Sequence, residues 1–315
     1  MDVGRRPACS LAARRGRAAT GGPNGRGRGR PGLPGEGPHH GPGPDPGHVS
    51  PPESVAANSV PPGPRTPLVL RAGRAPGPAV MTAGTALLVG GSSELGLAVL
   101  EELLGPPPRR VVLAGRPSGE LWRNAEQLRD IGYYVTTAQY DACLRADEIE
   151  GMLTHACTDH PLSLAVVAIG TMSAESFAEG IVVNGLSVAL LLRALVQRGP
   201  EQVVLLSSAA AVRPRQSIAA YSLGKQLADS AAVLLARQAA ESGVRILIVR
   251  AGFVTTRMTA GMAKPPLATT PDRVARAVAR AVHARRRVVW VPRGMELAVR
   301  ILNLVPRRLL PAGWR

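Results

Sequence analysis

A serine, a tyrosine and a lysine have the spacing in this sequence that is best suited to chemistry. Lys225 follows Tyr221 by four residues, so a helix would place both side chains on one face. Ser208 ends a short apolar run thirteen residues before Tyr221. An ammonium group beside a phenol favours the phenolate, so we expect the pKa of Tyr221 to move towards neutrality. A phenol of this kind, with a hydroxyl nearby, can exchange a proton with a carbonyl or alcohol oxygen.

A glycine-rich turn at residues 89–96 is the second feature that indicates chemistry. It follows the apolar run 86–89 and precedes a helical pattern. Backbone N–H groups at the start of such a helix can bind a phosphate. A plain tight turn is the alternative, but the position after a first strand favours dinucleotide binding. The turn residues predicted to bind are Gly90, Ser92, Ser93, Glu94, Leu95 and Gly96.

The choice of dinucleotide depends on residues close to this turn. Arg116 follows the second apolar run, where a basic group would accept the 2′-phosphate of NADP(H) and an acidic group would bind the ribose of NAD(H). The negative charge of Glu94, close to the same pocket, would repel this 2′-phosphate and so favours NAD(H). The sequence therefore leaves both NADH and NADPH open, and Arg116 as a solvated surface residue is a further alternative.

Strand-like and helical patterns alternate from residue 86 to residue 291. This order predicts βαβ units in a parallel sheet that is covered on both faces. We expect an α/β, doubly wound Rossmann fold with about seven strands. The expected strands are 86–89, 110–113, 133–137, 164–168, 203–206, 244–249 and 288–291, and the expected helices are 95–104, 121–131, 174–197, 218–242 and 271–284.

These motifs together resemble the short-chain dehydrogenase/reductases over about residues 85–292. In that resemblance Ser208, Tyr221 and Lys225 match the catalytic triad, and Asn184 matches the residue that supports a proton-relay water. Tyr221 would donate the proton, Ser208 would hold the substrate oxygen, and Lys225 would bind the nicotinamide ribose. Tyr221 and Lys225 are thus also expected among the cofactor-binding residues. The further cofactor-binding positions that the resemblance implies are Asp141 for the adenine, Ala168 and Gly170 after the fourth strand, and Thr256 for the nicotinamide carboxamide.

Three departures from the family pattern are visible. Glu94 replaces the middle glycine of the turn, residues 167–170 (VAIG) stand in place of NNAG, and Ala251 replaces a proline. Segments 87–98, 244–258 and 289–307 resemble the decaprenylphosphoryl-2-keto-erythro-pentose reductases of actinobacteria, which also show the first two departures. These reductases are one subunit of decaprenylphosphoryl-ribose 2′-epimerase. That resemblance implies reduction of a lipid-linked 2-keto-pentofuranose to the arabinofuranose for cell-wall arabinan, NADH as donor, and a flavin oxidase as partner.

Other functions remain open at this point. A related reductase acting on another carbonyl or alcohol is one alternative. A non-catalytic dinucleotide sensor is another, although a sensor needs no tuned phenol. No metal site is expected, because the three cysteines (Cys9, Cys143 and Cys157) follow no metal-ligand or disulfide spacing, which fits a reduced compartment.

The first 80 residues differ in composition from the rest of the chain. Gly and Pro supply 32 of them, and Phe, Trp and Tyr are absent. We expect a disordered leader, translated from a start upstream of the natural Met81. The net charge of +16 includes only two lysines beside 36 arginines, which resembles the codon bias of a GC-rich genome. Nucleic acid, including RNA bound by the leader, is therefore a disfavoured partner.

The predicted domain covers residues 81–293, and a basic amphipathic segment follows at 294–315. This segment either closes the substrate cleft, packs at a subunit interface, or lies on anionic lipid. No secretory signal or run of 18 apolar residues is evident, so we expect a bacterial protein that is cytoplasmic or peripherally bound to the membrane, with the periplasmic face as the alternative. The family resemblance also implies a homo-oligomer.

Overall fold

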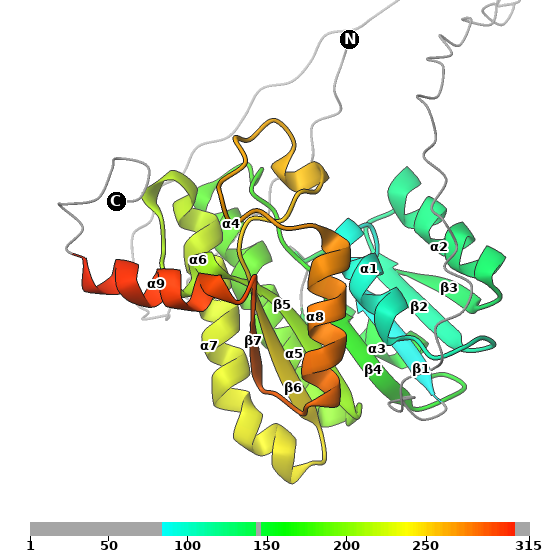
Figure 1. Ribbon diagram of the computed structural model, residues 1–315. Helices are drawn as coiled ribbons and strands as arrows, with labels where there is room; N and C mark the ends of the chain where they lie inside the picture. The colour runs from blue at the N-terminus through cyan, green and yellow to red at the C-terminus, as the bar shows by residue number, and fades with distance from the viewer. Residues whose placement is uncertain (1–83, 143–145, 306–315) are drawn as a thin grey trace, which may run out of the picture. The chain divides into compact units, whose positions relative to one another are not determined.

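The computed structural model describes residues 84–142 and 146–305, which form a seven-stranded sheet with helices on both faces (Figure 1). The strand order is β3-β2-β1-β4-β5-β6-β7, and every neighbouring pair is parallel. The predicted doubly wound fold is therefore confirmed. The predicted leader (1–80) and the end of the C-terminal segment (306–315) lie outside the described residues.

All seven expected strands are present, with bounds that differ by a few residues. Apolar residues that alternate along each strand enter two separate cores: Leu87 and Val89 face one, and Ala86 and Leu88 face the other. Burial on both faces explains the nearly continuous apolar runs. The strands are β1 (Thr85–Val89), β2 (Arg110–Gly115), β3 (Tyr134–Gln139), β4 (Leu162–Val167), β5 (Gln202–Ser208), β6 (Arg245–Ala251) and β7 (Val288–Val291).

Two layers of helices cover the sheet. One core contains the buried side chains of α1 (Glu94–Leu103), α2 (Gly119–Ile131) and α8 (Pro271–His283), and α1 lies beside α8 (Figure 1). The other core contains those of α3 (Ala146–Ala156), α5 (Ser187–Arg198) and α7 (Ala219–Glu241). The short elements are α4 (Phe177–Ile181), α6 (Ala209–Val212), η2 (Gln216–Ile218) and η3 (Arg257–Thr259), and α9 (Gly294–Leu304) ends the described chain.

Two helical regions differ from the sequence prediction. No helix was expected between β3 and β4, but α3 lies there and buries Ile149, Met152, Leu153 and Ala156 at helical spacing. The single helix predicted at 174–197 is divided by a π turn, η1 (Val182–Leu186), between α4 and α5. The extra residue in this turn brings Asn184 into the protein interior.

The segment Phe177–Arg198 is also long and apolar enough, by composition, to cross a membrane. In this fold 56% of its apolar window is buried, and α5 contributes Val188, Leu191, Leu192 and Leu195 to the core. Its apolar character is therefore explained by packing against the sheet.

The strand order places the candidate site. The chain moves outwards from β1 to β3 and then crosses back to β4 beside β1. In such sheets the connections leave in opposite directions at this point, and a crevice opens at the carboxyl ends of the strands. The glycine-rich turn follows β1 at this edge, and residues 168–170 follow β4.

Candidate active site

Ser208, Tyr221 and Lys225 come together as predicted. Ser208 ends β5, and the other two residues lie in the first two turns of α7. A hydrogen bond links the side chains of Ser208 and Tyr221 and acts to lower the pKa of the phenol. The Nζ of Lys225 lies 5.9 Å from the centroid of the Tyr221 ring. A hydroxyl, a phenol and an amine therefore share one end of the sheet.

Lys225 is buried and bound by the backbone. Its Nζ donates to the carbonyl oxygens of Ile169 at 2.8 Å and Leu206 at 2.9 Å. Burial lowers the pKa of Lys225 from 10.5 to about 8, and the negative charge of Asp229 acts in the opposite direction. The lysine thus connects α7 to the ends of β4 and β5.

The expected shift of the Tyr221 pKa is wrong in direction. Burial raises the pKa of this phenol above its usual 10, and this effect outweighs the lowering by Ser208 and by the charge of Arg215. The Nζ of Lys225 donates to two carbonyl oxygens instead of the phenol, and burial disfavours its own charge. A phenol with a raised pKa stays protonated at neutral pH, which is the state that a proton donor needs.

Asn184 is fully buried and uses its whole carboxamide. Its Oδ1 accepts the N–H of Thr171 at 2.8 Å, and its Nδ2 donates to the carbonyl oxygens of Thr171 at 2.9 Å and Gly180 at 2.7 Å. A Cβ on Gly170 would lie 3.3 Å from both Asn184 Oδ1 and Lys225 Nζ. Asn184 therefore lies beside the lysine, and here it fixes the loop that follows β4.

A buried ion pair behind Lys225 was not predicted. Asp229, one helical turn after Lys225, accepts hydrogen bonds from Ser207 Oγ at 2.7 Å and from Arg250 Nη2 at 2.7 Å. The Arg250 guanidinium also lies over the Trp290 ring, 5.3 Å from its centroid. The network joins α7 to β5, which carries Ser208, and to β6. The spacing of Lys225 and Asp229 was the available signal, since both lie on one helical face.

The glycine-rich turn has the tight geometry that the sequence predicted. Gly90 has a φ of +94°, and a Cβ there would lie 2.7 Å from the Ala168 carbonyl oxygen. A Cβ on Gly96 would lie 2.6 Å from that of Ala168. Ser93 caps α1 by accepting the N–H of Gly96 at 3.0 Å. The turn therefore fits the cradle that a dinucleotide pyrophosphate needs at the first helix of this fold.

The Glu94 carboxylate is held by Arg257 through two contacts. It accepts the backbone N–H of Arg257 at 2.9 Å and pairs with Arg257 Nε at 3.3 Å. The same guanidinium donates to the Ser92 carbonyl oxygen at 2.7 Å and contacts Glu120 on α2. Neither Arg257 nor Glu120 was singled out from the sequence, because nothing in a linear pattern brings them to the turn.

The remaining predicted cofactor residues follow the ends of other strands. Arg116 is exposed after β2, Asp141 is partly buried after β3, and Ala168 follows β4. Thr256 lies after β6, where its side chain accepts the N–H of Thr259 in a reciprocal cap of η3. All of these positions lie at the carboxyl edge of the sheet, and their contacts with a cofactor remain predictions.

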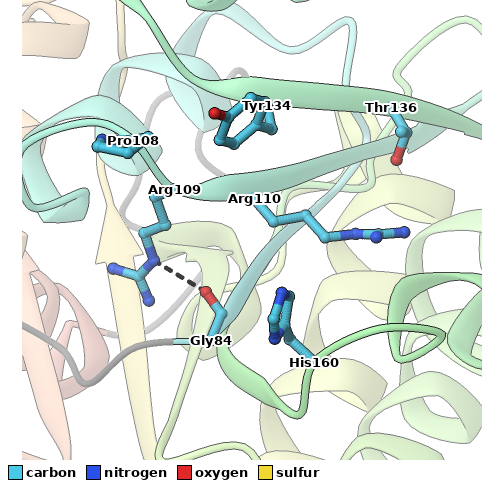
Figure 2. A pocket seen from close by; sticks show the side chains of 7 residues that line it. All are labelled: Gly84, Pro108, Arg109, Arg110, Tyr134, Thr136 and His160. Atoms are coloured by element: carbon cyan, nitrogen blue, oxygen red, sulfur yellow. Dashed lines mark hydrogen bonds between the residues drawn. The ribbon is translucent and has the colours of Figure 1, made fainter.

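A cavity of about 400 Å³ lies at the opposite end of the strands (Figure 2). There Arg109 donates from Nε to the Gly84 carbonyl oxygen at 3.1 Å, and Arg110 pairs with Asp159. The cavity contains none of the predicted site residues, so it is separate from the candidate active site. Its lining residues are Gly84, Pro108, Arg109, Arg110, Tyr134, Thr136 and His160.

Solved structures with this fold support the architecture. The 3-oxoacyl-[acyl-carrier protein] reductase of Brucella melitensis, in complex with NAD, matches with a TM-score of 0.60 and 19% identity over 69% of this chain and 98% of that one. A short chain dehydrogenase of Burkholderia cenocepacia, in complex with NADP, matches with a TM-score of 0.59 and 21% identity over 74% of this chain and 100% of that one.

Sequence relatives identify the family more directly. An uncharacterized oxidoreductase of Mycobacterium tuberculosis is 32% identical over 242 residues, 71% of this chain and 95% of the relative. An uncharacterized oxidoreductase of Streptomyces coelicolor is 31% identical over 236 residues, 71% of this chain and 93% of the relative. The family described as short chain dehydrogenase matches residues 84–266, which include the glycine-rich turn and the Ser208, Tyr221 and Lys225 site. The chain therefore belongs to the short-chain dehydrogenase/reductase family of oxidoreductases.

Proposed function

We propose that this protein reduces a carbonyl group with a nicotinamide dinucleotide, NADH or NADPH, as donor. The observation that carries the proposal is the grouping of Ser208, Tyr221 and Lys225 at the carboxyl edge of the sheet. The glycine-rich turn at the same edge supplies a place for the dinucleotide phosphates. A protonated Tyr221 can supply the proton that carbonyl reduction requires.

Each residue of the site has a distinct task in this proposal. Ser208 donates its hydroxyl proton to the carbonyl oxygen in a hydrogen bond, which orients the substrate. Tyr221 delivers a proton to that oxygen as negative charge develops on it. Lys225 keeps a positive charge beneath the phenol and binds the nicotinamide ribose. Asn184 fixes the loop after β4 and, as the family resemblance implies, supports a water through which the proton is replaced.

A bound nicotinamide supplies the hydride for this reaction. The residues proposed to hold the dinucleotide are Gly90, Ser92, Ser93, Leu95 and Gly96 at the pyrophosphate, Asp141 at the adenine, Ala168, Gly170 and Lys225 at the nucleoside of the nicotinamide, and Thr256 at the carboxamide. Arg116 favours NADPH, since its exposed guanidinium follows β2, whereas Glu94 favours NADH.

For the substrate we propose a decaprenylphosphoryl-2-keto-erythro-pentofuranose, reduced to the arabinofuranose for cell-wall arabinan with a flavin oxidase as partner. The support is the similarity of the turn with Glu94 and of residues 167–170 to the reductases of that pathway. A different carbonyl substrate is the alternative within the family.

An exposed apolar stripe on α9 supports contact with a lipid surface. Leu297, Ile301 and Leu304 are 63%, 52% and 84% exposed and lie on one face of the helix. Exposed arginines at 293 and 300 flank this stripe, a combination typical of helices that lie on anionic lipid. The helix is bound beside the site, because Asn303 accepts a hydrogen bond from Arg213 at the end of α6. We therefore propose peripheral membrane contact through α9.

A second copy of the chain is the partner proposed for another exposed surface. Leu186 and Leu190 on η1 and α5, and Leu223 and Leu227 on α7, are 38% to 47% exposed. α5 and α7 lie side by side, so these leucines favour a homo-oligomer built on the two helices.

The test is a comparison of substrates with purified protein. Oxidation of NADH and of NADPH is followed with the keto-pentosyl polyprenyl phosphate and with soluble ketones. We expect turnover of the keto-pentosyl lipid to exceed that of the soluble ketones. Turnover of soluble ketones alone would contradict the lipid substrate and keep the reductase, and the absence of dinucleotide binding would contradict the whole proposal.

A further inference from the structure

Arg257 connects three elements around the phosphate turn. It begins η3, the short helix after β6, and its guanidinium reaches the Ser92 carbonyl oxygen within the turn at 2.7 Å. The same group contacts Glu94 at the start of α1 and Glu120 at the start of α2. Its side chain is 49% exposed, so it lies at the surface of the crevice and not beneath it.

The two carboxylates hold different parts of the arginine. Glu94 binds the base of the guanidinium through Nε at 3.3 Å and also accepts the backbone N–H of Arg257 at 2.9 Å. Glu120 contacts only the terminal Nη1. Glu120 also pairs with Arg123 from its own helix, so it keeps a cationic partner if Arg257 turns away. Glu94 therefore fixes the position of the guanidinium, whereas the Nη1 that Glu120 binds can turn to another acceptor.

Charge makes this arrangement significant for an anion. Two carboxylates beside the start of α1 repel a pyrophosphate, which binds at that helix start in this fold. Arg257 is the side chain that pairs with both of them and touches the turn itself. Arginine also suits the task, because its planar fork of donors matches phosphate oxygens.

We propose that Arg257 is a cofactor-binding residue, which exchanges its contact with Glu120 for the pyrophosphate of the bound dinucleotide while Glu94 keeps it in position. This inference rests on the proposed dinucleotide-dependent function. In this chain Glu94 stands where the family pattern has a glycine, and it positions a guanidinium at the phosphate turn.

The experiment measures binding without turnover. Isothermal titration calorimetry of the full chain with ADP, NADH and adenosine separates the pyrophosphate from the nucleoside. We expect Arg257→Gln to weaken ADP and NADH by about tenfold to a hundredfold, the range for a lost charged hydrogen bond, and to change adenosine binding by less than twofold. ADP binding to the wild-type protein should also weaken as salt is raised, more steeply than ADP binding to the variant.

Two further variants separate a binding role from a structural one. Glu120→Gln removes the competitor for Nη1, so ADP should bind several-fold more tightly, and this gain should shrink in the Arg257→Gln background. Arg237→Gln is the matched control: it also removes an arginine that pairs with a glutamate, but this pair is with Glu241 at the far end of α7, where Arg237 is 92% exposed. We expect it to change ADP affinity by no more than about twofold.

The outcomes distinguish the two proposals. If the wild-type chain binds ADP and NADH but Arg257→Gln binds them equally well, this inference is wrong and the proposed function stands. A loss of ADP affinity in Arg237→Gln as large as in Arg257→Gln would show that only the total charge matters and would also overturn this inference. If the wild-type chain binds neither ADP nor NADH, the proposed function and this inference both fail.

Discussion

Asp229 and Arg250 form a two-point ion pair, with Arg250 Nη2 2.7 Å from Asp229 Oδ1 and Arg250 Nε 3.1 Å from Asp229 Oδ2. Asp229 also accepts a hydrogen bond from the hydroxyl of Ser207, which precedes Ser208 in β5. It lies one helical turn behind Lys225 and contributes the charge that opposes the loss of the lysine's proton. One carboxylate therefore favours the charged form of Lys225 and also binds the residue that precedes the active-site serine.

Removing this carboxylate should destabilise the protein strongly. Asp229→Ala leaves Arg250, whose side chain is only 19% exposed, without its partner, so we expect the free energy of unfolding to fall by about 3 kcal/mol. Urea unfolding measures the loss. Glu241→Ala is the control, because it breaks the exposed pair with Arg237 and should cost less than about 1 kcal/mol. Equal losses in the two variants would contradict the importance of the buried pair.

The buried lysine should make stability depend on pH above neutrality. The pKa of Lys225 is about 8 in the folded protein against 10.5 as reference, so between these values the unfolded chain binds more protons and stability rises with pH. From pH 8 to 9.5 this amounts to about 2 kcal/mol. Urea unfolding of wild type and Lys225→Met across this range should show the rise in wild type only. A parallel rise in both proteins would assign it to other groups.

Replacing the phenol should separate chemistry from binding. Tyr221→Phe removes the proposed proton donor and keeps the ring, so we expect turnover to fall by about 10²–10⁴-fold. The dissociation constant of NADH, measured by fluorescence titration, should stay within about twofold of wild type. Turnover above roughly a tenth of the wild-type value would show that the proton comes from another group.

Arg116 should decide between the two dinucleotides. If its guanidinium binds the 2′-phosphate, Arg116→Ala weakens NADPH by about 1.5–3 kcal/mol and leaves NADH nearly unchanged. Calorimetric titration with both cofactors measures the difference. The same change for both would make Arg116 a surface residue.

The exposed stripe on α9 should direct binding to lipid. Leu297→Ser with Ile301→Ser removes apolar side chains that are more than half exposed, so stability should hardly change. Cosedimentation with vesicles of anionic phospholipid should fall several-fold and should weaken with salt in the wild-type protein. Leu234→Ser on α7, which is 80% exposed, is the control and should sediment like wild type. Unchanged sedimentation of the α9 variant would contradict the membrane contact.

The sequence predicted the strands and the positions of the triad because both depend on local pattern. Apolar runs of four to seven residues identify strands that are buried on both faces. Tyr221 and Lys225 share a helical face through their spacing alone. The segment that forms α3 also has apolar residues at helical spacing, but its first turn is polar and it contains Gly151. The helical pattern is therefore weak, and no helix was predicted there.

The contacts that were missed join distant parts of the chain. Arg257 and Ser92 are 165 residues apart, and Asp229 and Arg250 are 21 apart on different elements. The pKa of Tyr221 was misjudged for the same reason, since burial depends on everything packed around the phenol. Without knowledge of which loops meet at the carboxyl edge, a sequence pattern identifies charged residues but not their partners.

The π turn at Val182–Leu186 interrupts the apolar segment Phe177–Arg198, and it carries one residue that faces the interior and one that faces solvent. Each added residue rotates the following residues by about 100° about the helix axis, so α5 turns a different face to the sheet than an uninterrupted helix from Phe177 would. Asn184 faces inwards at this step while Leu186 remains 47% exposed. Deleting a single residue here would restore a regular helix and turn the asparagine away from Thr171. The fold thus accepts a less regular helix at this turn so that an amide can lie beside the reacting groups.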